Sequence, residues 1–176
     1  MSLSGTRVVV LAANLFEDTE LLYPVLRLEE EQAEVTLASV DGQPVTGKKG
    51  HGPVPVATSV DEVDATDFDG VVIPGGFAPD ALRRSEAVLE LVRAFDGAEK
   101  PIAFICHAGW VPISARIIDG RRATSVATIK DDMVNAGCDW EDAEVVVDGN
   151  LISSRHPGDL GPWLRTIITT LGGRTS

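Results

Sequence analysis

Apolar residues along the chain follow two patterns that alternate from the N-terminus onward. Short β-branched and apolar runs, typical of buried strands in a parallel sheet, cover residues 7–12, 34–39, 68–73 and 102–105. Segments with apolar residues at every third or fourth position, the period of an amphipathic helix, cover residues 16–31, 86–95, 107–118, 129–136 and about 157–171. The pattern therefore predicts strands and helices in alternation.

Glycine and proline mark where these elements end. Pro74-Gly75-Gly76 closes the third strand, and Asp148-Gly149-Asn150 separates two short β-rich runs, 144–147 and 151–154, which indicates a β-hairpin. Pro24 lies inside the first helical pattern and predicts a kink or a restart, since proline removes a backbone donor. The Gly- and Pro-rich segment 44–60 predicts a loop or small hairpin with little regular structure.

This order of elements predicts an α/β fold, a flavodoxin-like three-layer sandwich with a mostly parallel central sheet and a C-terminal β-hairpin. A chain of 176 residues suits a single domain, residues 1–176, large enough to bury a core without disulfide or metal staples. In such sheets, ligands bind beyond the carboxyl ends of the strands. Polar residues directly after strands are therefore the first candidates for function.

Composition excludes several classes of partner. The formal net charge of −12 argues against nucleic acid, which requires clustered Lys and Arg. No apolar run approaches the roughly 20 residues of a membrane span, and the N-terminus has no secretion signal, so we expect a cytoplasmic protein. Cys106 and Cys138 are the only cysteines and lack the spacing of a disulfide framework or zinc site. We expect no metal and no cofactor.

Cys106 and His107 stand where the fourth strand runs into a helical pattern. A cysteine at a helix start faces unpaired backbone N–H groups and the positive end of the helix dipole, which favour the reactive thiolate. The alternative is a small apolar residue that ends a core strand, the commoner fate of a free cysteine. Glu17 follows the first strand and Gly75-Gly76 the third, so all of these features are expected at one edge of the sheet.

Each residue expected near Cys106 allows a catalytic interpretation and a purely structural one. Beside a thiolate, Glu17 would be pushed toward its protonated form and could pass a proton to substrate, although it could also be a simple helix N-terminal acid. Glu20 shares its helix face and is a candidate supporting residue. Gly75 and Gly76 form either a tight turn or a pair of backbone donors for an oxyanion. His107 is a candidate acid or base, oriented by a carboxylate from elsewhere.

Several separated stretches carry a family resemblance that covers nearly the whole chain. They are residues 13–21, 72–80, 105–107, 129–137, 142–150 and 153–155. In these stretches the chain resembles the PfpI family, within the superfamily that also holds the Parkinson-linked deglycase and the class I glutamine amidotransferase domains.

The resemblance implies a nucleophilic Cys106 with Glu17 as its carboxyl partner, and oxyanion donors at the Gly75-Gly76 turn. It also implies a homo-oligomer, dimer or hexamer, in which His107 meets an acid from a neighbouring subunit. That acid corresponds to Asp80, where close relatives carry glutamate.

The chain departs from the family pattern around the cysteine. Relatives continue with Gly-Pro after Cys-His, whereas this chain has Ala108-Gly109-Trp110, so Ala108 is expected to line the substrate site and Trp110 to lie near it. Phe77 stands where a basic residue is common and Val126 where an aromatic residue or histidine is common. We therefore expect a less polar pocket than in relatives.

The leading hypothesis is a stress-protective cysteine enzyme of the glyoxalase III or deglycase type. The Cys106 thiolate would add to a reactive carbonyl, such as methylglyoxal, or to a glycation adduct on a protein, with Glu17 and His107 moving protons. One alternative is a redox sensor in which Cys106 is oxidised. Another is an intracellular cysteine peptidase, ranked lower because a buried thiol leaves little room for an extended peptide.

Overall fold

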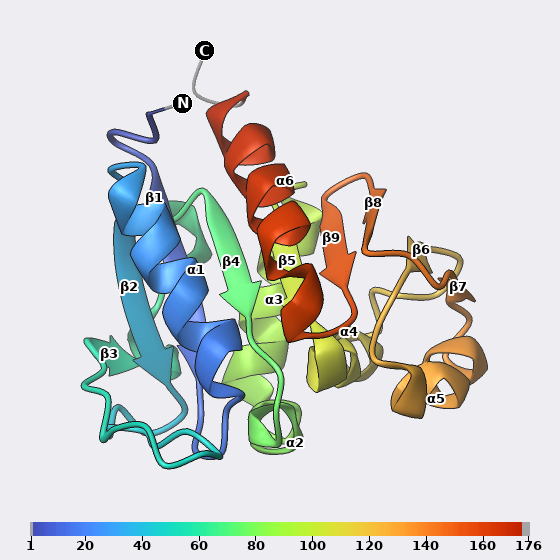
Figure 1. Cartoon of the computed structure of the whole chain (residues 1–176), viewed down its shortest axis with the longest axis horizontal. Helices are drawn as coiled ribbons and strands as arrows, with labels where there is room; N and C mark the ends of the chain where they lie inside the picture. Colours follow the sequence, from blue (N-terminus) through green and yellow to red (C-terminus); the bar gives the residue numbers. More distant parts are fainter. Residues whose placement is uncertain (1, 174–176) are drawn as a thin grey trace.

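A seven-stranded sheet forms the centre of the protein, seen here in a computed structural model that describes residues 2–173 (Figure 1). The strand order is β3-β2-β1-β4-β5-β9-β8, and every neighbouring pair is parallel except the antiparallel β8–β9 hairpin. The strands are β1 Arg7–Ala12, β2 Glu34–Ser39, β3 Thr58–Ser59, β4 Gly70–Ile73, β5 Ile102–Ile105, β8 Val145–Asp148 and β9 Leu151–Ser154.

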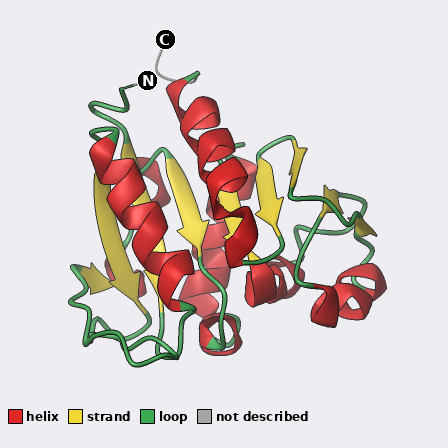
Figure 2. Ribbon diagram, viewed as in Figure 1, coloured by secondary structure: helices red, strands yellow, loops and turns green. Residues whose placement is uncertain are grey.

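Helices cover both faces of this sheet, as Figure 2 shows. On one face lie α1 Asp18–Glu30 and α6 Leu160–Gly172, and on the other α3 Glu86–Gly97 and α4 Trp110–Ala115. The short α2 Ala78–Leu82 follows β4, and α5 Lys130–Asn135 packs beside a two-stranded sheet of β6 Arg122–Ala123 and β7 Asp139–Trp140. Five 3₁₀ turns complete the described elements: η1 Val60–Glu62, η2 Ala65–Asp67, η3 Cys106–Gly109, η4 Ala127–Ile129 and η5 Pro157–Asp159.

The core lies in two layers because successive strand residues point to opposite faces of the sheet. In β1, Val8 and Val10 belong to the layer under α1 and α6, whereas Val9 and Leu11 belong to the layer under α3. The largest fully buried side chain is Trp163 of α6, whose Nε1 donates a hydrogen bond to the backbone oxygen of Ile152 at 3.1 Å. This contact joins α6 to strand β9.

The predicted fold class is confirmed, including the mostly parallel sheet and the C-terminal hairpin. The structure differs from the sequence-based predictions for two of the helices. Pro24 lies inside one continuous helix, so α1 does not restart there; its buried face packs on the sheet along the whole helix. The helix after Cys106 begins with the 3₁₀ turn η3, and α4 ends at Ala115, earlier than expected, because Arg116 adopts a left-handed conformation with φ of 61°.

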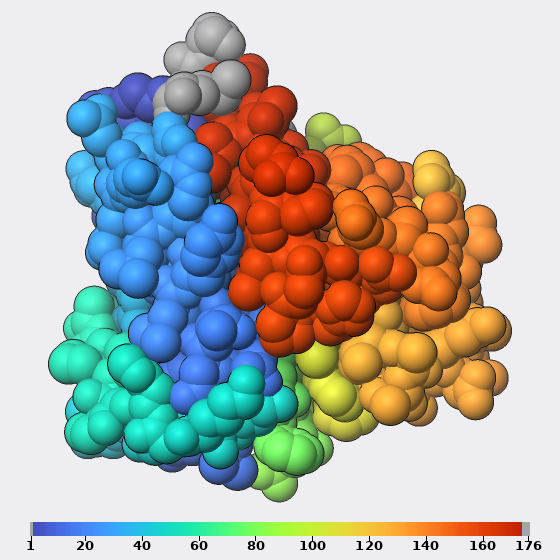
Figure 3. Space-filling view, viewed as in Figure 1, coloured from blue at the N-terminus to red at the C-terminus, as the bar shows by residue number. Residues whose placement is uncertain are grey.

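The carboxyl ends of the parallel strands form the lower edge of the sheet in Figure 1. The segment between β2 and β3 runs along this edge, below the start of α1, as the space-filling view shows (Figure 3). No helix within residues 2–173 is both long and apolar enough to cross a membrane.

Trp163 provides a test of the packing between α6 and the sheet. Trp163→Ala is expected to lower the free energy of unfolding by about 3–5 kcal/mol, because it leaves a cavity and an unpaired carbonyl. Circular dichroism during urea denaturation measures this change. The control is Leu26→Ala, a side chain 64% exposed on α1, which should cost no more than about 0.5 kcal/mol. Equal losses in the two variants would contradict this account of the core.

Candidate active site

Cys106 is the first residue after β5 and opens the turn η3. Its φ of 62° lies in the left-handed region, which non-glycine residues rarely adopt and which costs on the order of 1 kcal/mol or more. The side chain is only 8% exposed, and its Sγ lies 3.3 Å from Nδ1 of His107. The strained turn therefore presents a nearly buried thiol to an imidazole at the carboxyl edge of the sheet.

Glu20 is the carboxyl group that meets this thiol. Its side chain is fully buried, and Oε2 accepts a hydrogen bond from the backbone N–H of Gly75 at 2.9 Å. A methyl group on Gly75 would lie 2.5 Å from Glu20 Oε2 and 2.7 Å from Cys106 Cβ. The carboxyl and the cysteine thus converge on a position that only glycine can occupy.

Burial is the main cause that raises the pKa of Glu20, to about 7, and the nearby charge of Glu17 adds to it. The Gly75 hydrogen bond acts in the opposite direction but is weaker. The other carboxyl oxygen, Oε1, is buried without a hydrogen-bond partner among the described residues. A carboxyl group with a pKa near neutrality is chemically suited to general acid or base catalysis.

Glu17 occupies a different environment from the one expected. It lies at the N-cap of α1, and its carboxylate forms ion pairs with Lys48 Nζ at 2.5 Å and Lys49 Nζ at 2.8 Å. Burial opposes ionisation, but the two lysines outweigh it and lower the pKa of Glu17. The prediction of a protonated Glu17 is therefore wrong, and Glu20, expected only to support it, is the buried carboxyl with a raised pKa.

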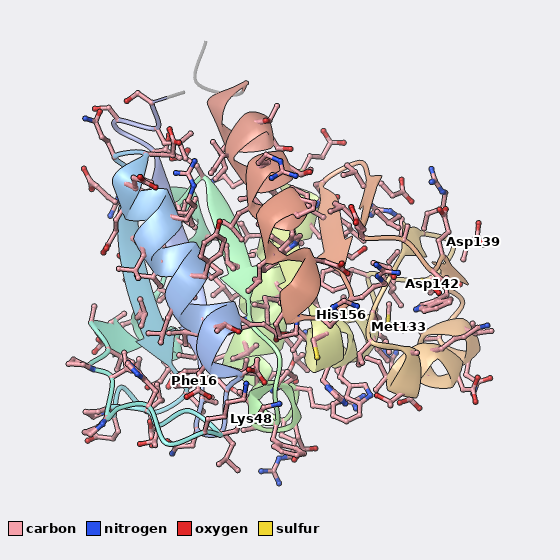
Figure 4. All side chains as sticks on the ribbon, viewed as in Figure 1. Phe16, Lys48, Met133, Asp139, Asp142 and His156 are labelled. Atoms are coloured by element: carbon pink, nitrogen blue, oxygen red, sulfur yellow. The ribbon has the colours of Figure 1, made fainter. Side chains whose placement is uncertain are left out.

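The two lysines come from the loop between β2 and β3, which Asp18 ties to the start of α1. The Asp18 carboxylate accepts the backbone N–H of Lys49 at 3.0 Å and that of His51 at 3.2 Å. Lys48 donates its own N–H to the oxygen of Phe16 at 2.9 Å, and Figure 4 shows these two residues together at the carboxyl edge. The loop is therefore a fixed part of the site.

Lys48 was missed by sequence reasoning. Its Nζ forms an ion pair with Glu17, and its positive charge lowers the pKa values of Cys106 and His107. The available signal was a pair of adjacent lysines in a glycine-rich loop of a strongly acidic chain. Only the folded structure shows that this loop turns back over the carboxyl edge.

The thiol of Cys106 is stabilised in its protonated form. Burial, followed by the charge of Glu20, raises the pKa of Cys106 to about 12. Backbone N–H groups of His107 and Gly76 and the charge of Lys48 act in the opposite direction. Burial and the neighbouring Glu20 charge both act against the thiolate that was expected at the start of the helix.

The backbone N–H groups of Gly75 and Gly76 have different partners. The N–H of Gly75 is already bonded to Glu20, whereas the N–H of Gly76 is directed at Cys106. Gly76 has a φ of 80°, and a side chain there would collide with the backbone of residues 15–17. Of the two predicted oxyanion donors, Gly76 has its N–H directed at the sulfur.

His107 is neutral, since burial and then the charge of Lys48 lower its pKa. Its Nε2 lies 3.3 Å from Oγ1 of Thr128, a residue that sequence reasoning did not single out. Within the described chain, Asp80 is exposed on α2 and forms no hydrogen bond or ion pair with His107. A contact between Asp80 and the His107 of another subunit stays a prediction.

Three residues that depart from the family pattern lie next to Cys106 or His107. Ala108 is fully buried in η3, and Trp110 packs its ring edge against the His107 ring at 5.3 Å between centroids. Val126 donates its N–H to the oxygen of Cys106 at 3.4 Å, while Phe77 is 63% exposed. Among residues 2–173, no three His, Cys, Asp or Glu side chains gather as metal ligands.

Fold and site together define an α/β protein with a thiol, an imidazole and a buried carboxyl at the carboxyl edge of its sheet. The chain belongs to the DJ-1/PfpI family, whose model matches residues 6–170.

Known relatives cover almost the whole chain. The protein named "Deglycase PfpI" from Pyrococcus furiosus is 48% identical over 165 residues, 94% of this chain and 99% of the relative. "Putative cysteine protease YraA" from Bacillus subtilis is 39% identical over 94% of this chain and 98% of its own. The crystal structure of Drosophila melanogaster DJ-1beta superposes with a TM-score of 0.89 at 32% identity, covering 98% of this chain and 92% of that one.

The raised pKa of Glu20 predicts a stability that depends on pH. As pH rises from the ordinary value of 4.5 toward about 7, the unfolded chain loses this proton before the folded protein does, so folding becomes less favourable. Glu20→Gln should therefore leave stability unchanged near pH 4.5 and increase the free energy of unfolding at pH 8, by up to about 3 kcal/mol. Urea denaturation at the two pH values measures this difference.

The matched control is Glu17→Gln. Its lowered pKa contributes stability that is present above the ordinary carboxyl pKa and is lost as pH falls, so this variant should be less stable than the parent at pH 8. A Glu20→Gln protein that is destabilised at pH 8 to the same degree as Glu17→Gln would contradict the assignment of the two carboxyl groups.

Proposed function

We propose that this protein is a cysteine-dependent enzyme of the deglycase type, which converts a reactive 2-oxoaldehyde, or its early adduct with an amine, into a 2-hydroxy acid. One observation carries the proposal: a nearly buried Cys106 lies between the His107 imidazole and the Glu20 carboxyl, whose pKa is about 7. The name of the Pyrococcus furiosus relative supports the same reaction class. A substrate of this kind is small enough for a thiol that is 8% exposed.

The first step activates the sulfur. In this proposal the resting group is a thiol, and His107 Nδ1, at 3.3 Å, accepts its proton as the sulfur adds to the aldehyde carbon. The negative oxygen then takes this proton from His107, and the product is a hemithioacetal. With an amine adduct, the sulfur takes the place of the amine, which leaves with one proton. The Gly76 N–H directed at Cys106 is positioned to donate to the oxygen that becomes negative.

The second step moves hydrogen between the two substrate carbons. The Glu20 carboxylate removes the proton from the former aldehyde carbon while the neighbouring carbonyl oxygen gains a proton, which gives an enediol. The second carbon is then protonated as the hydroxyl on the first carbon loses its proton. The first carbon is oxidised to a thioester and the second is reduced to an alcohol, so no external oxidant is needed. Water then hydrolyses the thioester, which releases lactate when the substrate is methylglyoxal and restores the thiol.

Lys48 stabilises negative charge during these steps. Its ammonium group lowers the pKa of Cys106 and is held in place by Glu17 at 2.5 Å. In this proposal Glu17 is a positioning residue, and Glu20 is the carboxyl that exchanges protons with substrate.

The test measures methylglyoxal consumption and lactate formation without glutathione. Cys106→Ser should abolish both, because serine is a far weaker nucleophile at neutral pH. Glu20→Gln should lower turnover at least about 100-fold, the contribution of a general acid or base. In that variant the thiol should still react with iodoacetamide. Glu17→Gln, the matched control, should retain more turnover than Glu20→Gln.

Absence of turnover in the parent protein would overturn the enzyme proposal. Selective oxidation of Cys106 by dilute hydrogen peroxide in that case would support the redox-sensor alternative, since a protonated Glu20 can donate a hydrogen bond to the oxidised sulfur. Cleavage of unstructured peptides that requires Cys106 would support the peptidase alternative, for which the Bacillus subtilis relative is named.

A further prediction concerns the lysine beside the thiol. Lys48→Met should raise the pKa of Cys106 above that of the parent, because a positive charge that lowers it has been removed. The pH dependence of iodoacetamide alkylation measures this pKa. Lys49→Met is the control: Lys49 shares Glu17, but its side chain is 65% exposed, so it should change the profile less. A larger effect from Lys49 would contradict the role given to Lys48.

A further inference from the structure

Thr128 extends the site beyond the residues used so far. Its Oγ1 lies 3.3 Å from His107 Nε2, and the other ring nitrogen, Nδ1, lies 3.3 Å from Cys106 Sγ. The three side chains thus form a series of contacts that runs from the sulfur through the imidazole to the hydroxyl. Thr128 belongs to η4 and Cys106 to η3, so two separate segments hold the ring between them.

The chemistry of the imidazole decides what a hydroxyl at this position does. If Nδ1 is to accept the thiol proton, the single proton of neutral His107 has to be on Nε2, and that N–H requires an acceptor. After the transfer both ring nitrogens carry protons, and Nε2 still donates. A threonine oxygen can accept from Nε2–H in both states without a change of partner.

The His107 ring is also restrained by an aromatic neighbour. Trp110 packs against it at 5.3 Å, and the indole is anchored by a hydrogen bond from Nε1 to Asp132 Oδ2 at 2.8 Å. The guanidinium of Arg83 lies over the same indole, 5.4 Å from its centroid. These contacts limit rotation of His107 and leave its two nitrogens aimed at the sulfur and the hydroxyl.

The charged groups around His107 do not take the place of the hydroxyl. Lys48 opposes protonation of the ring, the Glu20 carboxyl accepts the N–H of Gly75, and Asp132 and Arg83 are engaged with Trp110. Among residues 2–173, no carboxylate forms a hydrogen bond or ion pair with His107. Thr128 is therefore the polar partner of Nε2 in this chain.

We propose that Thr128 is a positioning residue for His107: its hydroxyl accepts the Nε2 proton, keeps Nδ1 directed at Cys106, and stabilises the imidazolium formed when the thiol is deprotonated. This inference rests on the proposed role of His107 as base in the deglycase-type reaction.

The experiment compares Thr128→Val, which removes the hydroxyl at nearly constant shape, with Thr128→Ser, which keeps it. The pKa of His107 is measured by NMR titration of its ring C–H signals, assigned with His107→Gln. Because an acceptor for Nε2–H favours the charged ring, Thr128→Val should lower this pKa by about half a unit to one unit, and Thr128→Ser should restore it.

Kinetics provide the second readout. Thr128→Val should lower kcat for methylglyoxal about tenfold with little change in KM, and Thr128→Ser should stay within about twofold of the parent. Urea denaturation of both variants shows whether they fold equally well.

An unchanged His107 pKa in Thr128→Val would overturn the positioning role. Loss of activity in Thr128→Ser equal to that in Thr128→Val would overturn it as well, because the hydroxyl is then not what matters. The NMR titration needs no substrate. A shifted pKa in a protein without turnover would therefore support the role of Thr128 while refuting the reaction.

Discussion

The site depends on the burial of one carboxyl group, that of Glu20, against the thiol of Cys106. Both groups pack against Gly75, where an added methyl group would lie 2.5 Å from the carboxyl oxygen of Glu20. A buried carboxylate and a buried thiolate cannot both be charged at low cost, so the pair holds its protons more tightly than either group would in water. The strained turn at Cys106 and the continuous helix α1 both serve to keep these groups together.

The loop between β2 and β3 balances the charge of this pair. Lys48 and Lys49 share the carboxylate of Glu17, so the loop brings one more positive charge than that carboxylate neutralises. Asp18 holds the loop by two backbone hydrogen bonds. In a chain with a formal net charge of −12, the lysines of this loop place positive charge beside the buried carboxylate of Glu17.

Membership of the DJ-1/PfpI family and the local geometry describe the site at different levels. The family accounts for the central sheet and the helices that flank it. The particular surroundings of His107 come from Trp110 and Thr128, one packed against its ring and the other beside Nε2. These two residues give the imidazole of this chain its own environment, and with it the means to adjust the reactivity of the thiol.

The sequence by itself determined the sheet, the hairpin and the edge at which Cys106, His107 and the Gly75-Gly76 turn would meet, because alternating apolar periods and turn residues are local signals. Which carboxyl reached the thiol was decided by the tertiary structure. Glu17 and Glu20 are three residues apart, and their pKa values move in opposite directions because a distant loop brings lysines to the first, while the second is fully buried by the fold. The contacts of Lys48 and Thr128 span more than twenty residues of sequence, at separations where hydrophobic periodicity carries no information about side-chain partners.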